Sequence, residues 1–141
     1  MNDISFDAFV GYLESVVDAV GLERIPLLGI SQGCSSSIAY AVRHPERVTH
    51  LVLYGGYARC SGFWGSEQDR KRNAALKSLI LNGWGMEISV FHQVFTSLFF
   101  PDGTAEQAQW FNDLQRITTT PENAYRIRDA GDQLDRGGFA V

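Results

Sequence analysis

Ile25-Pro26-Leu27-Leu28-Gly29-Ile30-Ser31-Gln32-Gly33-Cys34 is the stretch that decides the fold of this chain. Its apolar run ends in the pattern Gly-x-Ser-x-Gly, and a helix rich in small residues is expected to follow, from Ser35 to Arg43. Between a strand and a helix, this pattern forms a sharp turn that holds the serine at a strained backbone angle, with its hydroxyl clear of the sheet. The stretch therefore predicts Ser31 as a nucleophile.

The residues around Ser31 suit that chemistry. Side chains at Gly29 and Gly33 would collide where the strand and the helix pass closely, so glycine is expected at both positions. A helix N-terminus favours developing negative charge, and the backbone N–H of Gln32 is placed to hold an oxyanion. The alternative interpretation is a glycine-rich turn that carries a passive serine.

The flanking segments predict a βαβ unit preceded by a helix. Ser5 can cap a helix over residues 6–20, where apolar residues recur at three- and four-residue steps. Residues 25–30 and 48–54 predict two parallel strands, apolar on both faces as strands covered by helices are. Gly55-Gly56 marks the turn at the carboxyl end of the second strand, where open α/β sheets bind ligands.

Together these segments resemble an α/β-hydrolase of the serine esterase type, in particular the hydrolase domains of bacterial regulator-like and adenylate-cyclase-like proteins. The resemblance covers most of the chain and is carried by the elbow Gly29–Gly33, by His44-Pro45-Glu46-Arg47-Val48, by Leu51–Tyr57 and by Pro121-Glu122-Asn123-Ala124. Cys34 departs from the small residue, often glycine, of this lineage. The resemblance implies an incomplete α/β-hydrolase fold, with a βαβ unit around the nucleophile elbow plus a helical lid.

The second half of the chain predicts helices. A capping box at Thr104 and Gln107 starts one of them, and Pro121 starts another. Residues 61–111 hold six phenylalanines and all three tryptophans, which form either the core of this block or part of an apolar pocket. The candidate pocket residues are Ile30, Phe63, Trp64 and Trp84. We expect a partial hydrolase core over residues 1–60, a helical lid over 61–135 and a tail over 136–141.

The remaining catalytic groups are not evident. A serine needs a histidine base, and the base needs an acid that orients it. His44 is expected to cap a helix, His50 lies at the wrong end of the sheet, and His92 in the presumed lid is the one candidate base. Three carboxylates follow the last expected helix without a later strand or histidine: Asp129, Asp132 and Asp135. The chain looks as if it begins and stops partway through the fold, so the second oxyanion donor is also missing.

Composition excludes several classes of function. With 45% apolar residues the chain can bury a core, and a net charge of −4 without a basic block argues against nucleic acid. No apolar run is long enough to span a membrane and no signal pattern is present, so a cytoplasmic protein without a membrane partner is expected. Cys34 and Cys60 are expected as reduced, buried thiols; no metal or cofactor is predicted. The open edges of a two-stranded sheet predict self-association or marginal stability.

The leading interpretation is hydrolysis of small or medium-chain carboxylic esters with an apolar acyl group, inferred from the resemblance and the aromatic lid. Activity is expected to be weak or absent, because the acid, the base and the second oxyanion donor are not evident. One alternative is a non-catalytic module that binds an apolar ligand or a protein partner. Another is cysteine chemistry at Cys34, since the first turn of a helix can activate a thiol.

Overall fold

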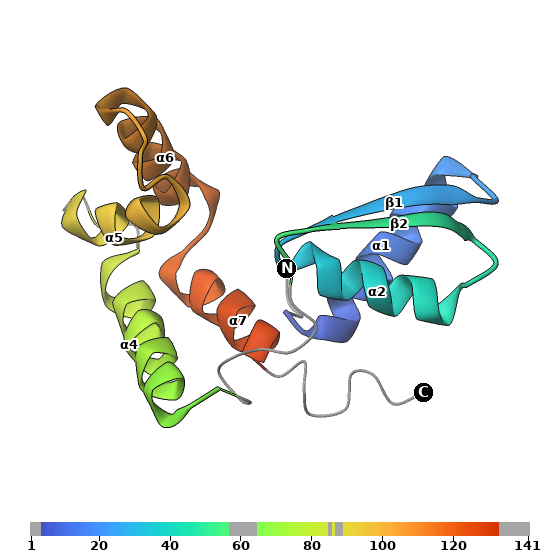
Figure 1. Ribbon diagram of the computed structural model, residues 1–141, viewed down its shortest axis with the longest axis horizontal. Coiled ribbons are helices and arrows are strands. Elements are labelled where there is room, and N and C mark those ends of the chain that lie inside the picture. Colours follow the sequence, from blue (N-terminus) through green and yellow to red (C-terminus); the bar gives the residue numbers. More distant parts are fainter. Residues whose placement is uncertain (1–3, 57–64, 85, 87–88, 133–141) are drawn as a thin grey trace. The chain divides into compact units, whose positions relative to one another are not determined.

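The computed structural model describes residues 4–56, 65–84, 86 and 89–132 (Figure 1). The chain divides into two compact units, one made of residues 1–66 and 130–141 and the other of residues 67–129. The first unit contains the predicted elbow, and the second is helical.

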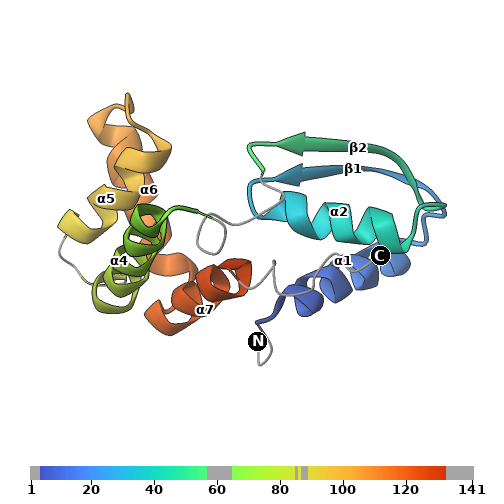
Figure 2. The same ribbon diagram turned by 60° about the horizontal axis from the view of Figure 1, so that its bottom comes forward.

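The first unit has the predicted order of helix, strand, helix and strand. Its elements are α1 (Phe6–Val20), β1 (Ile25–Ile30), α2 (Gly33–Arg43) and β2 (Val48–Tyr54). The two strands are parallel, and the register pairs Ile30 with Tyr54 at their carboxyl ends. Helix α2 packs against the strands and α1 packs on α2, so both helices lie on the same side of the sheet (Figure 2).

Local signals explain where α1 begins and ends. The Ser5 hydroxyl accepts a hydrogen bond from the Ala8 N–H at 3.2 Å, which satisfies one of the free donors of the first turn. Gly21 ends the helix in the left-handed conformation, with φ of 69°. The core beneath the sheet is formed by side chains from α1, β1 and α2: Val10, Val17, Ile25, Ala39 and Tyr40.

The sheet is covered on one face within the described residues. Alternate residues of β1 are buried against the helices, whereas Leu28 and Ile30 are 59% and 58% exposed. Their partners in the register, Val52 and Tyr54, are also exposed. The expectation that both faces of these strands are buried is therefore wrong for the described part of the chain, because α1 and α2 pack on the same side.

The second unit is built from helices: α4 (Glu67–Gly83), α5 (Ser89–Phe99), α6 (Ala105–Thr118) and the larger part of α7 (Pro121–Asp132). Helices α6 and α7 begin where Thr104 and Pro121 predict. The capping box of α6 is formed in both directions between Thr104 and Gln107. Asp129 and Asp132 lie inside α7 rather than after it, because the helix continues to Asp132. Asp129 forms an ion pair with Lys77 of α4 at 2.7 Å.

Helices α5 and α6 are joined by hydrogen bonds between buried polar side chains. The Thr96 hydroxyl donates to the side-chain oxygen of Asn112, and the Gln115 amide donates to Thr96 Oγ1 at 3.0 Å. His92 precedes Thr96 by one helical turn and is 4% exposed. Its Nε2 atom has no hydrogen-bond partner among the described residues. None of the described helices combines the length and apolar content needed to cross a membrane.

Candidate active site

Ser31 occupies the turn between β1 and α2 with an unusual backbone. Its φ is 52°, and it is the one non-glycine residue in the described part of the chain with a positive φ. The Ser31 N–H donates to the Tyr54 carbonyl at 2.9 Å, and the Ser31 carbonyl accepts from the Cys34 N–H at 3.0 Å. The residue is exposed. The predicted strained turn is therefore present, and it holds the serine outside the packed core.

The two glycines of the elbow have different environments. A Cβ at Gly29 would lie 2.7 Å from Cys34 Cα and 2.9 Å from Ser37 Oγ, so a side chain there collides with α2 as predicted. A Cβ at Gly33 would meet no heavy atom within 4 Å. The expectation of a collision at Gly33 is therefore wrong, because the first residue of α2 faces open space.

One contact of the elbow was not predicted from the sequence. Cys34 is 1% exposed, and a Cβ at Gly56 would lie 2.2 Å from its Sγ atom. Gly55 adopts a positive φ of 60° immediately before this contact. The Gly55-Gly56 pair indicated a turn, but nothing local in the sequence connects it with a thiol about 20 residues earlier along the chain.

Gln32 lies at the start of α2 with φ of −59° and ψ of −30°. Further along this turn, the N–H groups of Cys34 and Ser35 donate to the carbonyls of Ser31 and Gln32 at 3.0 and 3.2 Å. The role of the Gln32 N–H as oxyanion donor stays a prediction.

Two of the three histidines belong to the first unit and lie away from Ser31. His44 ends α2, its backbone N–H donates to the Tyr40 carbonyl, and its Nε2 lies 2.9 Å from a Glu14 carboxylate oxygen. The 11 residues of α2 place it about 16 Å along the helix from the elbow. His50 pairs with Pro26, about 13 Å before the carboxyl end of β2. The prediction of a helix cap at His44 is confirmed.

The remaining candidate site residues are divided between the two units. His92 belongs to the helical unit, where its ring is enclosed, and its role as base stays a prediction. The Trp84 indole N–H donates to the Thr119 carbonyl at 3.1 Å, and its ring contacts Phe95 edge-on. Ile30 is exposed beside Ser31. Two predicted pocket residues lie outside the described residues: Phe63 and Trp64. Among the described residues, no cluster of histidine, cysteine and carboxylate side chains could hold a metal ion.

An exposed serine at positive φ, between a parallel strand and a helix, is the geometry of the nucleophile elbow found in α/β hydrolases. Residues 2–126 match the family described as alpha/beta hydrolase fold, and the chain belongs to this family. The expected resemblance and fold class are confirmed.

Curated relatives match a short part of the chain. A 2-hydroxy-6-oxononadienedioate/2-hydroxy-6-oxononatrienedioate hydrolase from Pseudomonas putida is 48% identical over 44 residues, which are 31% of this chain and 15% of that protein. A 2-hydroxymuconate semialdehyde hydrolase from Pseudomonas sp. (strain CF600) is 45% identical over 49 residues, 35% of this chain and 17% of that protein. These relatives are named as hydrolases.

A solved structure matches nearly the whole length of this chain. The esterase from Exiguobacterium antarcticum superposes with a TM-score of 0.73 and 17% sequence identity. The match covers 92% of this chain and 48% of the esterase chain, so this chain spans about half of that structure. At this identity the likeness supports the fold.

The backbone of Ser31 predicts that glycine stabilises this position. Glycine adopts a positive φ without a steric penalty, whereas alanine keeps the strain of an L-residue. We expect Ser31→Gly to be more stable than Ser31→Ala by about 1 kcal/mol, although both lack the hydroxyl. Urea unfolding of the two variants measures this difference. Equal free energies of unfolding would contradict a left-handed backbone at this residue.

Proposed function

We propose that this chain carries the nucleophile of a serine hydrolase that acts on small or medium-chain carboxylic esters with an apolar acyl group. The exposure of Ser31, a residue held at positive φ directly after β1, is the observation that carries the proposal. The helical unit would serve as the lid that receives the acyl group.

In the proposed reaction, Ser31 Oγ attacks the carbonyl carbon of the ester and its proton passes to solvent water. The backbone N–H of Gln32 stabilises the oxyanion, and the bond between the carbonyl carbon and the alcohol oxygen breaks as that oxygen takes up a proton from water. Water then attacks the acyl-serine, which releases the carboxylic acid and restores the hydroxyl. The N-terminus of α2, the positive end of the helix dipole, follows Ser31 directly and would favour the negative charge of the oxyanion.

We expect the reaction to be slow in this chain. His44 and His50 are too far from Ser31 to accept its proton, since each lies more than about 10 Å away along its own element. Losing the histidine base alone costs about a million-fold in turnover in a well-studied serine hydrolase. Covalent labelling is therefore a more sensitive test than turnover.

The test is the reaction of the full chain with a fluorophosphonate. Ser31 Oγ forms a bond to phosphorus, and fluoride leaves together with the serine proton. We expect the added mass on the peptide that contains Ser31, its loss in Ser31→Ala, and its retention in Ser15→Ala. Ser15 is a suitable control because it is an exposed serine on ordinary helical backbone in the same unit. Wild-type labelling no greater than that of Ser31→Ala would refute the proposal.

The relatives suggest a second class of substrate for the same serine. Their printed names refer to hydrolysis of 2-hydroxy-6-oxo dienoic acids, and their identity to this chain reaches 52% over 44 residues. A substrate panel should therefore pair p-nitrophenyl butyrate with a 2-hydroxy-6-oxo dienoate. Turnover of the second compound alone, lost in Ser31→Ala, would favour this class over esters.

A non-catalytic module is the other candidate function. It is favoured by the exposed apolar side chains of the sheet, Leu28, Ile30, Val52 and Tyr54, which would bind an apolar ligand or pair with a second copy. Residual ester turnover that is unchanged in Ser31→Ala, together with sedimentation that depends on protein concentration, would support this alternative.

A further inference from the structure

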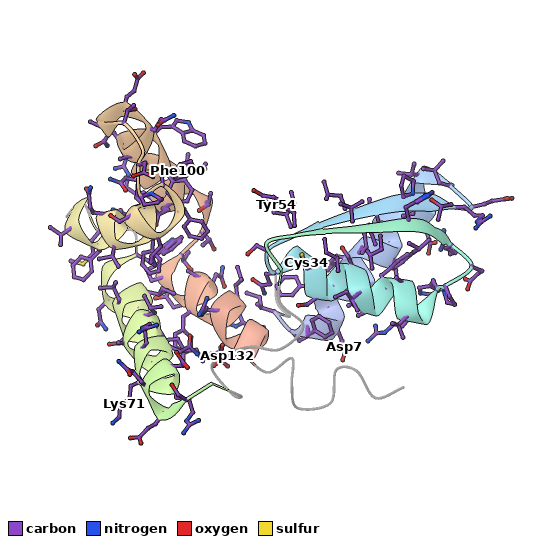
Figure 3. The ribbon with its side chains drawn as sticks, in the orientation of Figure 1. Asp7, Cys34, Tyr54, Lys71, Phe100 and Asp132 are labelled. Carbon is purple, nitrogen blue, oxygen red and sulfur yellow. The ribbon has the colours of Figure 1, made fainter. Side chains whose placement is uncertain are left out.

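The side chain of Cys34 lies between the carboxyl ends of the two strands. Its Sγ atom lies 3.2 Å from the Gly29 carbonyl oxygen of β1 and 3.6 Å from the Tyr54 carbonyl oxygen of β2, so the thiol proton can be donated to either. Figure 3 labels Cys34 at the start of α2 and Tyr54 at the end of β2. Cys34 is 1% exposed, so its thiol is shielded from water. Water therefore does not compete with the thiol for these two carbonyl oxygens.

Two of these residues, Cys34 and Tyr54, also hold the backbone of Ser31. The Tyr54 carbonyl that faces the thiol also accepts the Ser31 N–H at 2.9 Å. The Cys34 N–H donates to the Ser31 carbonyl at 3.0 Å. Ser31 is therefore connected to Cys34 directly on one side and through Tyr54 on the other. A shift of Cys34 would therefore disturb both hydrogen bonds of the strained residue.

Packing adds to the hydrogen bonds. A Cβ at Gly56 would lie 2.2 Å from Cys34 Sγ and 2.3 Å from Cys34 Cβ, so the segment after β2 closes directly over the thiol. On the other side, Cys34 Cα would lie 2.7 Å from a Cβ at Gly29. Cys34 thus fills the space between β1, β2 and the turn that carries Ser31.

We propose that Cys34 is a positioning residue for Ser31: its thiol joins the carboxyl ends of β1 and β2 and keeps the serine at its positive φ. The effect on reactivity rests on the proposed function, whereas the effect on backbone geometry does not. Since the thiol is enclosed, its role is to support the serine rather than to react itself.

The test compares Cys34→Ala, which removes the donor, with Cys34→Ser, which keeps one. The first measurement is amide hydrogen exchange at Ser31, whose N–H is bonded to Tyr54. We expect exchange to be about tenfold faster in Cys34→Ala and within about twofold of wild type in Cys34→Ser. Equal exchange in wild type and Cys34→Ala would overturn the inference, even if the protein never reacts with a fluorophosphonate.

The second measurement is the rate of fluorophosphonate labelling at Ser31 as a function of probe concentration. We expect the maximal rate to fall about fivefold in Cys34→Ala and to recover in Cys34→Ser, with the half-saturating concentration unchanged. Val10→Ala is the control, because it removes a fully buried side chain of the same unit away from the elbow and lowers stability without changing this rate. A labelling rate that falls equally in Val10→Ala would overturn the inference. Absence of labelling in wild type would refute the proposed function and leave the exchange result to decide the role of Cys34.

A double substitution tests the packing. Gly56→Ala places a methyl group on the thiol, whereas in Cys34→Gly the nearest remaining atom is the Ser31 carbonyl oxygen at 3.4 Å. We expect Gly56→Ala to accelerate Ser31 amide exchange in the wild-type background but to have little further effect in Cys34→Gly. The same acceleration in both backgrounds would show that the thiol does not fill this space.

Discussion

Alanine at Gly29 is expected to destabilise the first unit by about 3 kcal/mol and to abolish fluorophosphonate labelling of Ser31. The added Cβ would lie 2.7 Å from Cys34 Cα, which is backbone and cannot rotate away as a side-chain end could. Relief requires α2 to move off the sheet, and this movement stretches the bond between the Cys34 N–H and the Ser31 carbonyl. Urea unfolding followed by circular dichroism measures the loss of stability, and peptide mapping measures the labelling.

Gly33→Ala is the matched control for this prediction. It belongs to the same sequence pattern, but its Cβ would meet no atom within 4 Å and its φ is not positive. Alanine has the higher helix propensity, so we expect a free energy of unfolding within about 1 kcal/mol of wild type and unchanged labelling. Similar losses in both variants would mean that the strand and the helix do not approach most closely at Gly29.

Acidification is expected to destabilise the helical unit, starting below about pH 6.5. Burial is the main cause that lowers the pKa of His92; the positive charge of Arg116 lowers this pKa further, and the carboxylate of Asp113 acts in the opposite direction. A histidine in the unfolded chain binds its proton near pH 6.5. Below that pH the unfolded state binds more protons than the folded state, so the free energy of unfolding decreases as the pH decreases. The decline ends once the pH is below the pKa of folded His92.

The measurement is urea unfolding of the full chain between about pH 7.5 and pH 5, a range chosen to stay above the ordinary pKa of carboxylates. His92→Leu removes the titrating ring, and we expect its stability to change less with pH than that of wild type. His50→Gln replaces an exposed histidine of β2 and should keep the acid sensitivity. If His92→Leu lost stability as steeply as wild type, another group would be responsible.

The fold was predictable where local residues determine the structure of a short segment. Ser5, Thr104 and Pro121 start helices by capping or by a preset φ, and each helix begins where these residues indicate. The Gly-x-Ser-x-Gly pattern likewise predicted the strained backbone of Ser31, because strand, turn and helix are contiguous there. The face of the sheet that the helices cover was not predictable. Residues on both faces of β1 are apolar, so the sequence does not distinguish the covered face from the exposed one.

The strained turn at Ser31 was predictable, whereas the surroundings of the candidate site were less so. The contact of Cys34 with Tyr54 and Gly56 joins segments about 20 residues apart, and periodicity does not report such contacts. His92 sits on an apolar helix, and its enclosure beside α6 depends on tertiary packing. Gly33 was expected to be constrained because it shares a pattern with Gly29, although its own surroundings are open.

The carbonyl of Tyr54 that accepts the Ser31 N–H has a consequence for biosynthesis. A nascent chain that has emerged only as far as α2 contains the whole Gly-x-Ser-x-Gly pattern but lacks the Tyr54 carbonyl that accepts this N–H. This hydrogen bond can therefore form only after β2 has been translated and has paired with β1 in the native register. A ribosome-bound intermediate thus carries the whole pattern before the hydrogen bond that holds the Ser31 backbone exists.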